Sequence, residues 1–260
     1  MATYNKRGYR TPKEKLDENG FIENVEEVDE SESTTAGVFS SLDETASKTE
    51  AWVAKNQKYI FILVGAVAIL TVGYVLYQKF IVEPKEADAA EQMFTAQQNF
   101  DKALNGTSSD SLFTLALNGS EGKFGFVKIA EEYSGTDAAN LSHYYAGIAY
   151  LNLGKYDEAI ASLKDFSTKE VVLNALSKGA IGDAYAQKNQ NKEALDYYQK
   201  AANVDKNDFT TPRFLLKAGK IALTLGKNDE ALKHFTEIKE SYKKTPEANS
   251  VDALIGLSQK

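Results

Sequence analysis

The side chains that most often catalyse reactions or bind metals are scarce in this chain, which has two histidines and no cysteine. A zinc site needs three or four nitrogen or sulfur ligands close together. His143 and His234 are far apart and lack the spacing of metal ligands. Without cysteine, disulfides, thiolate metal sites and a lipid-modified N-terminal cysteine are excluded. We therefore expect no metal and no cofactor, and we interpret both histidines as ordinary helix residues.

Carboxylates are plentiful, but they alternate with lysines in the pattern of solvated helix faces. Glu131 and Glu132 are adjacent, and adjacent helix positions point about 100° apart, so the two cannot face one cleft. The GxSxG, Walker and HExxH motifs are missing from the sequence. The net charge of −7, without a stripe of lysine and arginine, argues against nucleic-acid binding. The sequence predicts no catalytic residue and no enzyme.

An uncharged apolar run, YIFILVGAVAILTVGYVLYQ, extends from Tyr59 to Gln78. A helix of this length covers about 30 Å, the thickness of a bilayer's hydrocarbon core. We predict a transmembrane helix over residues 58–79. The run begins too late for a signal peptide and no small-x-small site follows it, so we expect an uncleaved anchor. The aromatic residues expected at the membrane interfaces are Trp52, Tyr59, Tyr74 and Tyr77.

The orientation of this helix follows from the basic residues near its ends, since cytoplasmic flanks are richer in lysine and arginine. Lys48, Lys55 and Lys58 precede the span, whereas Lys79 and Lys85 follow it. The first fifteen residues add more basic side chains. We expect a cytoplasmic N-terminus and a C-terminal domain outside. The span has no ionisable residue and no GxxxG motif, so neither a transport pathway nor a tight helix dimer is indicated.

Two segments precede the span. Residues 1–35 join a basic stretch, NKRGYRTPKEK, to an acidic one, ENVEEVDESES, and we expect a disordered cytoplasmic tail. The alternative is an arm whose basic tip makes a weak contact with anionic lipid or ribosomal RNA. Residues 36–57 place apolar side chains at helical spacing and predict an amphipathic juxtamembrane helix, which lies on the membrane or packs against a partner.

Residues 80–123 have the pattern of connecting helices. We expect the membrane helix to continue past Pro84 and to stop near Gly106. A further helical pair follows, with the loop NGSEGKFG between its members, and no segment of the C-terminal domain alternates as a strand does.

Three later segments repeat, and the first of them reads YYAGIAYLNLGKYDEAIASLKDF. Equivalent small residues recur at intervals of 35 and 37 residues, namely Gly147, Gly182 and Gly219, followed by Ala159, Ala194 and Ala231. Such a period indicates two antiparallel helices per repeat, with small residues where the helices approach closely. The second repeat has Asn189 where the turn usually has glycine.

These segments resemble tetratricopeptide repeats over residues 124–245, with a capping helix expected over 246–260. The resemblance implies an α-solenoid of stacked helical hairpins. Together with the transmembrane helix predicted above, which precedes it, this gives an all-α fold. The resemblance also implies a concave groove lined by the first helix of each repeat. The groove residues that it implies are Tyr144, Ile148, Leu151, Asn152, Asp183, Gln187, Arg213, Leu216, Lys220 and Thr224.

Some such grooves grip a peptide's terminal carboxylate with a clamp of lysine and asparagine. Tyr144 and Ile148 occupy the matching places here, so the clamp is absent. A mixed groove suits an extended or helical protein segment. The alternative is that Tyr144, Ile148 and Leu151 only pack against neighbouring repeats.

The order of parts, together with the segment GFVKIAEEYSGTDAANLSHYYAGIAYLNLGKYDEAIASL, resembles the family of the ancillary subunit of the bacterial SecYEG translocon. That resemblance implies a single-pass inner-membrane protein with a periplasmic repeat domain. The partners it implies are Sec channel subunits, a membrane-anchored periplasmic chaperone of the prolyl-isomerase type, and exported polypeptides. Two alternatives stay open: a scaffold for another envelope complex, serving division, secretion or motility, and a repeat domain in the cytoplasm that sorts proteins at the membrane.

Overall fold

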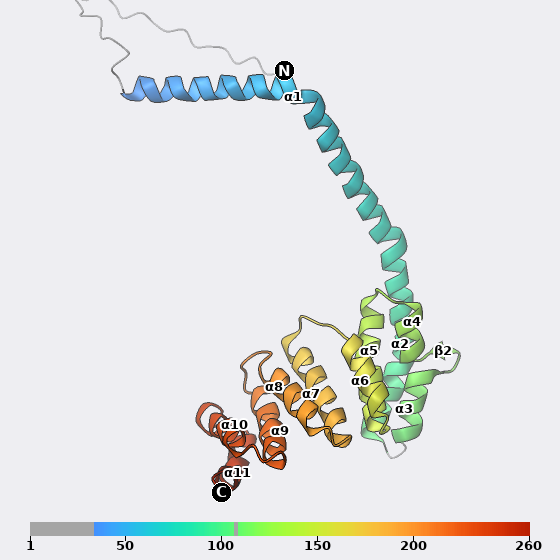
Figure 1. The fold of residues 1–260 in the computed structure, drawn as a ribbon. Coiled ribbons are helices and arrows are strands. Elements are labelled where there is room, and N and C mark those ends of the chain that lie inside the picture. Colours follow the sequence, from blue (N-terminus) through green and yellow to red (C-terminus); the bar gives the residue numbers. More distant parts are fainter. Residues whose placement is uncertain (1–33, 107–108) are drawn as a thin grey trace, which may run out of the picture. The chain divides into compact units, whose positions relative to one another are not determined.

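A computed structural model describes residues 34–106 and 109–260 (Figure 1). The fold predicted from the sequence is confirmed: the protein is all-α, with one long apolar helix followed by helical hairpins. The expected disordered tail lies almost wholly outside the described residues. The chain divides into two compact units, residues 1–72 and 73–260, which we describe separately.

The first unit contains most of helix α1 (Thr34–Tyr77). This helix includes all of the predicted juxtamembrane helix (36–57) and most of the predicted span (58–79). Ile69 and Leu70 keep 75% and 73% of their surface exposed. Large apolar side chains exposed along a whole helix indicate an apolar surrounding or a partner. Within the described residues, this is the one helix that is long and apolar enough to cross a membrane.

The second unit begins with the end of α1, a five-residue π-helix (Gln78–Val82) and helix α2 (Glu83–Asn105). Helical backbone continues through Pro84, although proline lacks an N–H and its ring crowds the preceding turn. The wider π turn accommodates this, because the N–H of Glu83 donates to the carbonyl of Gln78, five residues back. Helix α2 ends at Gly106, whose backbone is extended.

After α2 come α3 (Ser109–Asn118) and α4 (Phe126–Glu132). Between them the expected loop contains a two-stranded antiparallel hairpin, β1 (Gly119–Ser120) and β2 (Lys123–Phe124). The expectation of no strand was therefore wrong at this point. Gly119, Glu121 and Gly122 have positive φ angles, which bend the chain tightly enough for the two short segments to pair.

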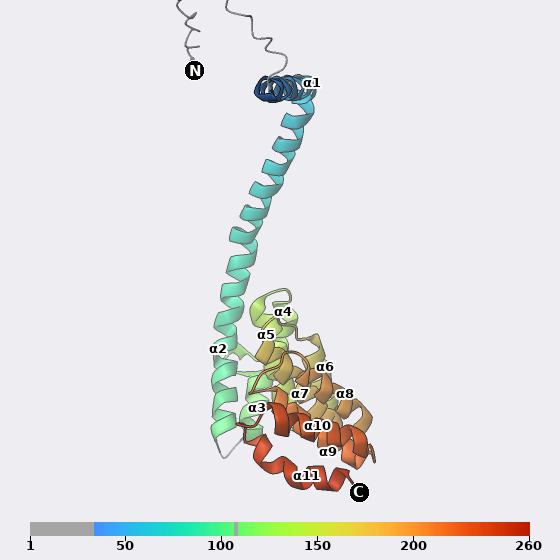
Figure 2. The same ribbon diagram turned by 90° about the vertical axis from the view of Figure 1, so that its left-hand side faces the viewer.

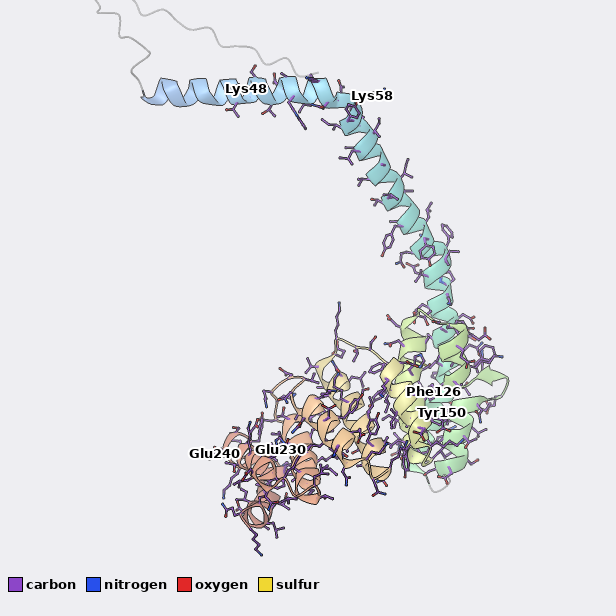
Figure 3. All side chains as sticks on the ribbon, in the orientation of Figure 1. Lys48, Lys58, Phe126, Tyr150, Glu230 and Glu240 are labelled. Atoms are coloured by element: carbon purple, nitrogen blue, oxygen red, sulfur yellow. The ribbon has the colours of Figure 1, made fainter. Side chains whose placement is uncertain are left out.

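The core of this part is aromatic. The ring of Phe100 makes edge contacts with Phe113, Phe126 and Tyr145, at centroid distances of 5.5, 6.1 and 5.0 Å. These residues come from α2, α3, α4 and the next helix, so the rings join four helices around one centre. Phe126 and Tyr150 are labelled in this part of the domain in Figure 3.

Three helical hairpins follow (Figures 1 and 2). Their helices are α5 (Asp137–Asn152) with α6 (Tyr156–Asp165), α7 (Val171–Gln187) with α8 (Asn191–Ala202), and α9 (Thr211–Thr224) with α10 (Asn228–Ser241). A 3-10 turn (Glu247–Ser250) and helix α11 (Val251–Ser258) lie within the segment expected to form a capping helix. Val251 of α11 is buried in the same core cluster as α9 and α10.

The same turn closes each hairpin. Gly154, Asn189 and Gly226 have φ angles of 72°, 57° and 71°, in the left-handed region. The next N–H reaches back to a helix carbonyl in all three turns, as from Gln190 to Tyr185 at 2.9 Å. Asparagine tolerates this conformation better than most residues with a side chain. This explains why the second repeat can have asparagine where the others have glycine.

Candidate protein-binding surface

Glycines mark the places where the two helices of each hairpin touch. A Cβ atom on Gly147 would lie 2.4 Å from Cγ of Leu163, and one on Gly182 would lie 2.7 Å from Cδ1 of Tyr198. At Gly219 it would lie 2.4 Å from Cε1 of Phe235. In each case the partner helix fills the space that a side chain would need.

The matching alanines, Ala159, Ala194 and Ala231, are fully buried. A fourth glycine, Gly179, was missed by the sequence analysis: its Cβ would lie 2.0 Å from Cε1 of Phe214. Phe214 belongs to α9, so this contact joins two successive repeats. The signal in the sequence is a second small residue one helical turn before Gly182.

Of the first-repeat residues of the expected groove, Tyr144, Ile148 and Leu151 are half-buried. Tyr144, Ile148 and Leu151 pack against an apolar cluster that extends into α7. The ring of Tyr144 lies 5.3 Å from that of Phe166, and burial raises the pKa of the Tyr144 hydroxyl. Asn152 is exposed, and its amide donates to the carbonyl of Ile148 at 2.8 Å. These residues thus contribute to packing between repeats as well as to the surface.

The second-repeat residue Asp183 is already paired. Its Oδ1 accepts hydrogen bonds from the Tyr198 hydroxyl at 2.6 Å and from Nζ of Lys217 at 2.5 Å. Burial, together with the Asp183 charge, raises the pKa of Tyr198 well above its usual range. Lys217 was not among the predicted groove residues, although it stands one turn before Lys220. Gln187 and Lys220 are exposed.

The third-repeat residues Arg213 and Thr224 are exposed and Leu216 is half-buried. The guanidinium of Arg213 opposes the rise in the pKa of Tyr144. Positive charge from the third repeat therefore reaches a first-repeat side chain. The expected groove residues thus include half-buried apolar side chains, such as Ile148 and Leu216, and exposed polar ones, such as Arg213 and Lys220.

Helix α2 is attached to this domain by a set of polar contacts that the sequence analysis missed. The carboxylate of Glu86 accepts hydrogen bonds from the backbone N–H groups of Asp137 and Ala138, at 2.7 and 2.9 Å. It therefore caps the N-terminus of α5 from another helix. Asp88 accepts a 2.5 Å hydrogen bond from the hydroxyl of Tyr133 and raises the pKa of Tyr133 to about 12.

Two further contacts join α2 to the hairpin. Oε1 of Gln92 accepts from the backbone N–H of Phe124 at 3.2 Å, and Glu91 forms a 2.7 Å ion pair with Lys123. The contact partners of these α2 side chains lie about thirty to fifty positions away along the chain. A local sequence pattern therefore cannot predict them. Helix α2 is consequently a packed part of the repeat domain and not a free linker.

The predicted interfacial aromatics, Trp52, Tyr59, Tyr74 and Tyr77, are all exposed on α1. The Tyr74 hydroxyl accepts from the side-chain amide of Gln78 at 2.9 Å. The place of these four aromatics at the two membrane interfaces stays a prediction.

The two histidines lie in different places. His143 lines an open cavity near the start of α5, with Asn140 and Asp165. His234 is buried in α10; its Nε2 lies 3.2 Å from Nε2 of Gln199, and its Nδ1 has no hydrogen-bond partner. Burial lowers the pKa of His234. Among the described residues, no three His, Cys, Asp or Glu side chains gather as a metal site would require.

Comparison with known families places tetratricopeptide repeat models on residues 144–208 and 214–245. The matched stretches cover α5 to α10, which is a shorter range than the predicted 124–245. No curated protein matches the chain. Tetratricopeptide repeats are protein–protein interaction modules and are typically not enzymes. The chain therefore contains tetratricopeptide repeats and, before them in the described part of the chain, one helix with the length and composition to cross a membrane.

Proposed function

We propose that this protein is a membrane-anchored accessory subunit of the Sec translocon that assists exported polypeptides on the periplasmic side of the bacterial inner membrane. The observation that carries the proposal is the order of parts in the described residues: an apolar helix of membrane-spanning length, then α2 packed into a domain of repeats. The likeness of the central stretch to the translocon's ancillary subunit family supports the choice of partner.

The binding surface in this proposal is formed by the first helices of the hairpins. The half-buried Ile148, Leu151 and Leu216 offer apolar contact, while the exposed Gln187 and Lys220 offer polar contact. Such a surface fits a polypeptide segment in which apolar and polar side chains alternate. The membrane-anchored chaperone would receive the same segment next.

The first test is a pull-down of the tagged full chain in mild detergent, with mass spectrometry of the proteins that stay bound. We expect Sec channel subunits, and we expect their loss when residues 59–78 are replaced by an unrelated span. Recovery of a division, secretion or motility complex without Sec subunits would replace this proposal with the scaffold alternative.

The second test locates the polypeptide. A photo-crosslinking amino acid at Gln187 or Lys220 should react with polypeptides in transit. The matched control places the same group at Lys192, which is exposed on α8, outside the proposed groove. Equal crosslinking from all three positions would show that the groove has no special role.

A further inference from the structure

Helix α1 bends at Lys58, directly before the apolar run that begins at Tyr59 (Figure 3). Two open cavities lie along this bend, with volumes of about 440 and 640 Å³. Ala54, Gln57 and Phe61 line both of them, so the two cavities adjoin. We call residues 53–62, which form most of the two linings, the α1 elbow.

The α1 elbow combines apolar side chains with positive charge. Ile60 and Phe61 line the first cavity, and Lys55 and Lys58 both line the second. The two lysines are three positions apart in a helix, so they are neighbours on its surface. The only acidic residue in either lining is Glu50, which belongs to the first cavity. A ligand in the elbow therefore meets apolar contact beside two ammonium groups.

The place of the elbow in the sequence determines which part of a membrane it meets. Residues 59–78 match the thickness of the hydrocarbon core, so Lys55 and Lys58 come at the level of the lipid headgroups in a membrane that α1 spans. Lysine side chains at the end of a spanning helix extend towards the charged interface. Ile60 and Phe61 begin the apolar run and lie beside the acyl chains. The two parts of a phospholipid thus meet matching parts of the elbow.

We propose that the α1 elbow binds one anionic phospholipid, whose phosphate is held by the ammonium groups of Lys55 and Lys58. The side-chain amide of Gln57 supplies a further hydrogen-bond donor, and Phe61 packs against an acyl chain. A zwitterionic headgroup carries its own ammonium group, which the two lysines repel, whereas an anionic headgroup has none. The inference rests on the membrane anchoring in the proposed function and does not depend on the Sec partner.

A lipid site in the elbow differs from the general attraction of anionic lipids to basic residues. General attraction depends on charge alone. The elbow also needs the open space beside Ala54, which is exposed and lines both cavities. A large side chain at Ala54 would fill this space and leave every charge in place. Such a variant therefore distinguishes the two kinds of lipid binding.

Trp52 gives a direct readout, because it is the only tryptophan of the chain and precedes the elbow by one residue. Its side chain is 61% exposed. The full chain is placed in nanodiscs of phosphatidylcholine that contain a minor fraction of a lipid brominated on its acyl chains, since bromine quenches tryptophan fluorescence at short range. Brominated phosphatidylglycerol should quench Trp52 about twofold more strongly than brominated phosphatidylcholine at the same fraction.

The double variant K55Q/K58Q should lose this preference, so that both brominated lipids quench equally. Its matched control, K243Q/K244Q, removes the same charge from exposed positions in the repeat domain and should keep the preference. Equal quenching by the two lipids in the unchanged chain, or the same loss in both double variants, would overturn the proposal.

The variant Ala54→Phe should lose the preference although its charges are unchanged. Ala46→Phe is the matched control, because Ala46 is exposed on the same helix and lines neither cavity. A preference that persists in Ala54→Phe would show general attraction and would overturn the site. Far-UV circular dichroism checks that each variant keeps its helices. If Ala54→Phe loses helix, Ala54→Leu decides, since leucine also fills the space and favours a helix.

The outcome for the lipid site is separable from that for the proposed function. A chain that does not enter nanodiscs would overturn the membrane anchoring and the lipid site together. A pull-down without Sec subunits would overturn only the choice of partner, because the quenching measurement contains no other protein.

Discussion

At Gly182 the ring of Tyr198 occupies the space that a side chain would need. The same relation holds at Gly147 with Leu163 and at Gly219 with Phe235. A single carbon added at any of these positions must displace a buried side chain, because protein interiors are close-packed. The recurring glycines are therefore a requirement of helix contact and not of backbone freedom.

The variant Gly182→Val should destabilise the domain by about 2 kcal/mol, in the range of overpacked cores. Urea denaturation of the full chain in detergent, followed by far-UV circular dichroism, measures this as a lower midpoint. Gly256→Ala is the matched control, because nothing lies within 4 Å of its new Cβ. Alanine there should leave the midpoint unchanged or raise it. A stable Gly182→Val variant would contradict the close contact.

We expect His234 to make the stability of the folded domain depend on pH. Burial lowers its pKa in the folded protein below the ordinary value of 6.5, against the opposing charges of Glu230 and Glu237. At a pH just below 6.5, His234 is therefore protonated more often in the unfolded chain than in the folded protein. Burial of the neutral imidazole thus contributes its full stability only at a pH above about 6.5. This contribution is lost as the pH falls from about 6.5 towards the folded pKa.

We expect a lower urea midpoint at about pH 5.5 than at about pH 7.5. The variant His234→Gln should reduce the difference, whereas His143→Gln, changed at a less buried position, should keep it. The pKa of Glu230 is lowered from 4.5, so the stability that its charge contributes is lost only below about pH 4.5. Glu230 therefore does not affect the comparison between about pH 5.5 and about pH 7.5. An unchanged difference in His234→Gln would exclude His234 as its source.

Among the elements, α2 has two roles. Its backbone continues from the apolar helix through the π turn, and its side chains cap and contact the domain. Successive repeats are joined in a similar way: Lys188 pairs with Asp157, and Lys206 pairs with Glu237 at 2.7 Å. Each of these contacts joins residues 31 positions apart, from neighbouring hairpins.

The variant Glu86→Ala should cost about 1–2 kcal/mol, the usual effect of losing a helix cap. Its specific signature is faster hydrogen exchange at the backbone N–H groups of Asp137 and Ala138, which lose their acceptor. Glu131→Ala, an exposed acidic residue on α4, serves as the control and should change neither amide. Unaltered exchange in Glu86→Ala would show that the cap does not form.

For the whole molecule, the absence of cysteine permits a clean labelling experiment. Single cysteines are introduced at Ala46, which precedes the apolar run in the sequence, and at Ser250, which follows it. Both positions are exposed. Under the proposed topology, a membrane-impermeant maleimide added to spheroplasts should label Ser250→Cys. It should label Ala46→Cys only after permeabilisation.

The reverse labelling pattern would place the repeats in the cytoplasm and exclude a periplasmic role. Labelling of both cysteines in intact spheroplasts would mean that the helix does not span the membrane. A pair of cysteines on one side of the helix, at Ser250 and Lys260, controls for access because both are exposed.

The sequence by itself determined the all-α class, the apolar helix and the repeated hairpins. These features rest on local composition and on short periods, such as the apolar run at 59–78 and the spacing of Gly147, Gly182 and Gly219. Hydrophobic periodicity reports a residue's own helix, so it is readable without tertiary structure.

Only the tertiary structure decided the long-range contacts. The cap that Glu86 makes on α5, the pairing of Asp183 with Lys217, and the position of Gly179 against Phe214 join residues from different helices. These contacts depend on which helix faces lie next to each other, and that arrangement arises from side-chain packing across the whole domain, which no local pattern encodes.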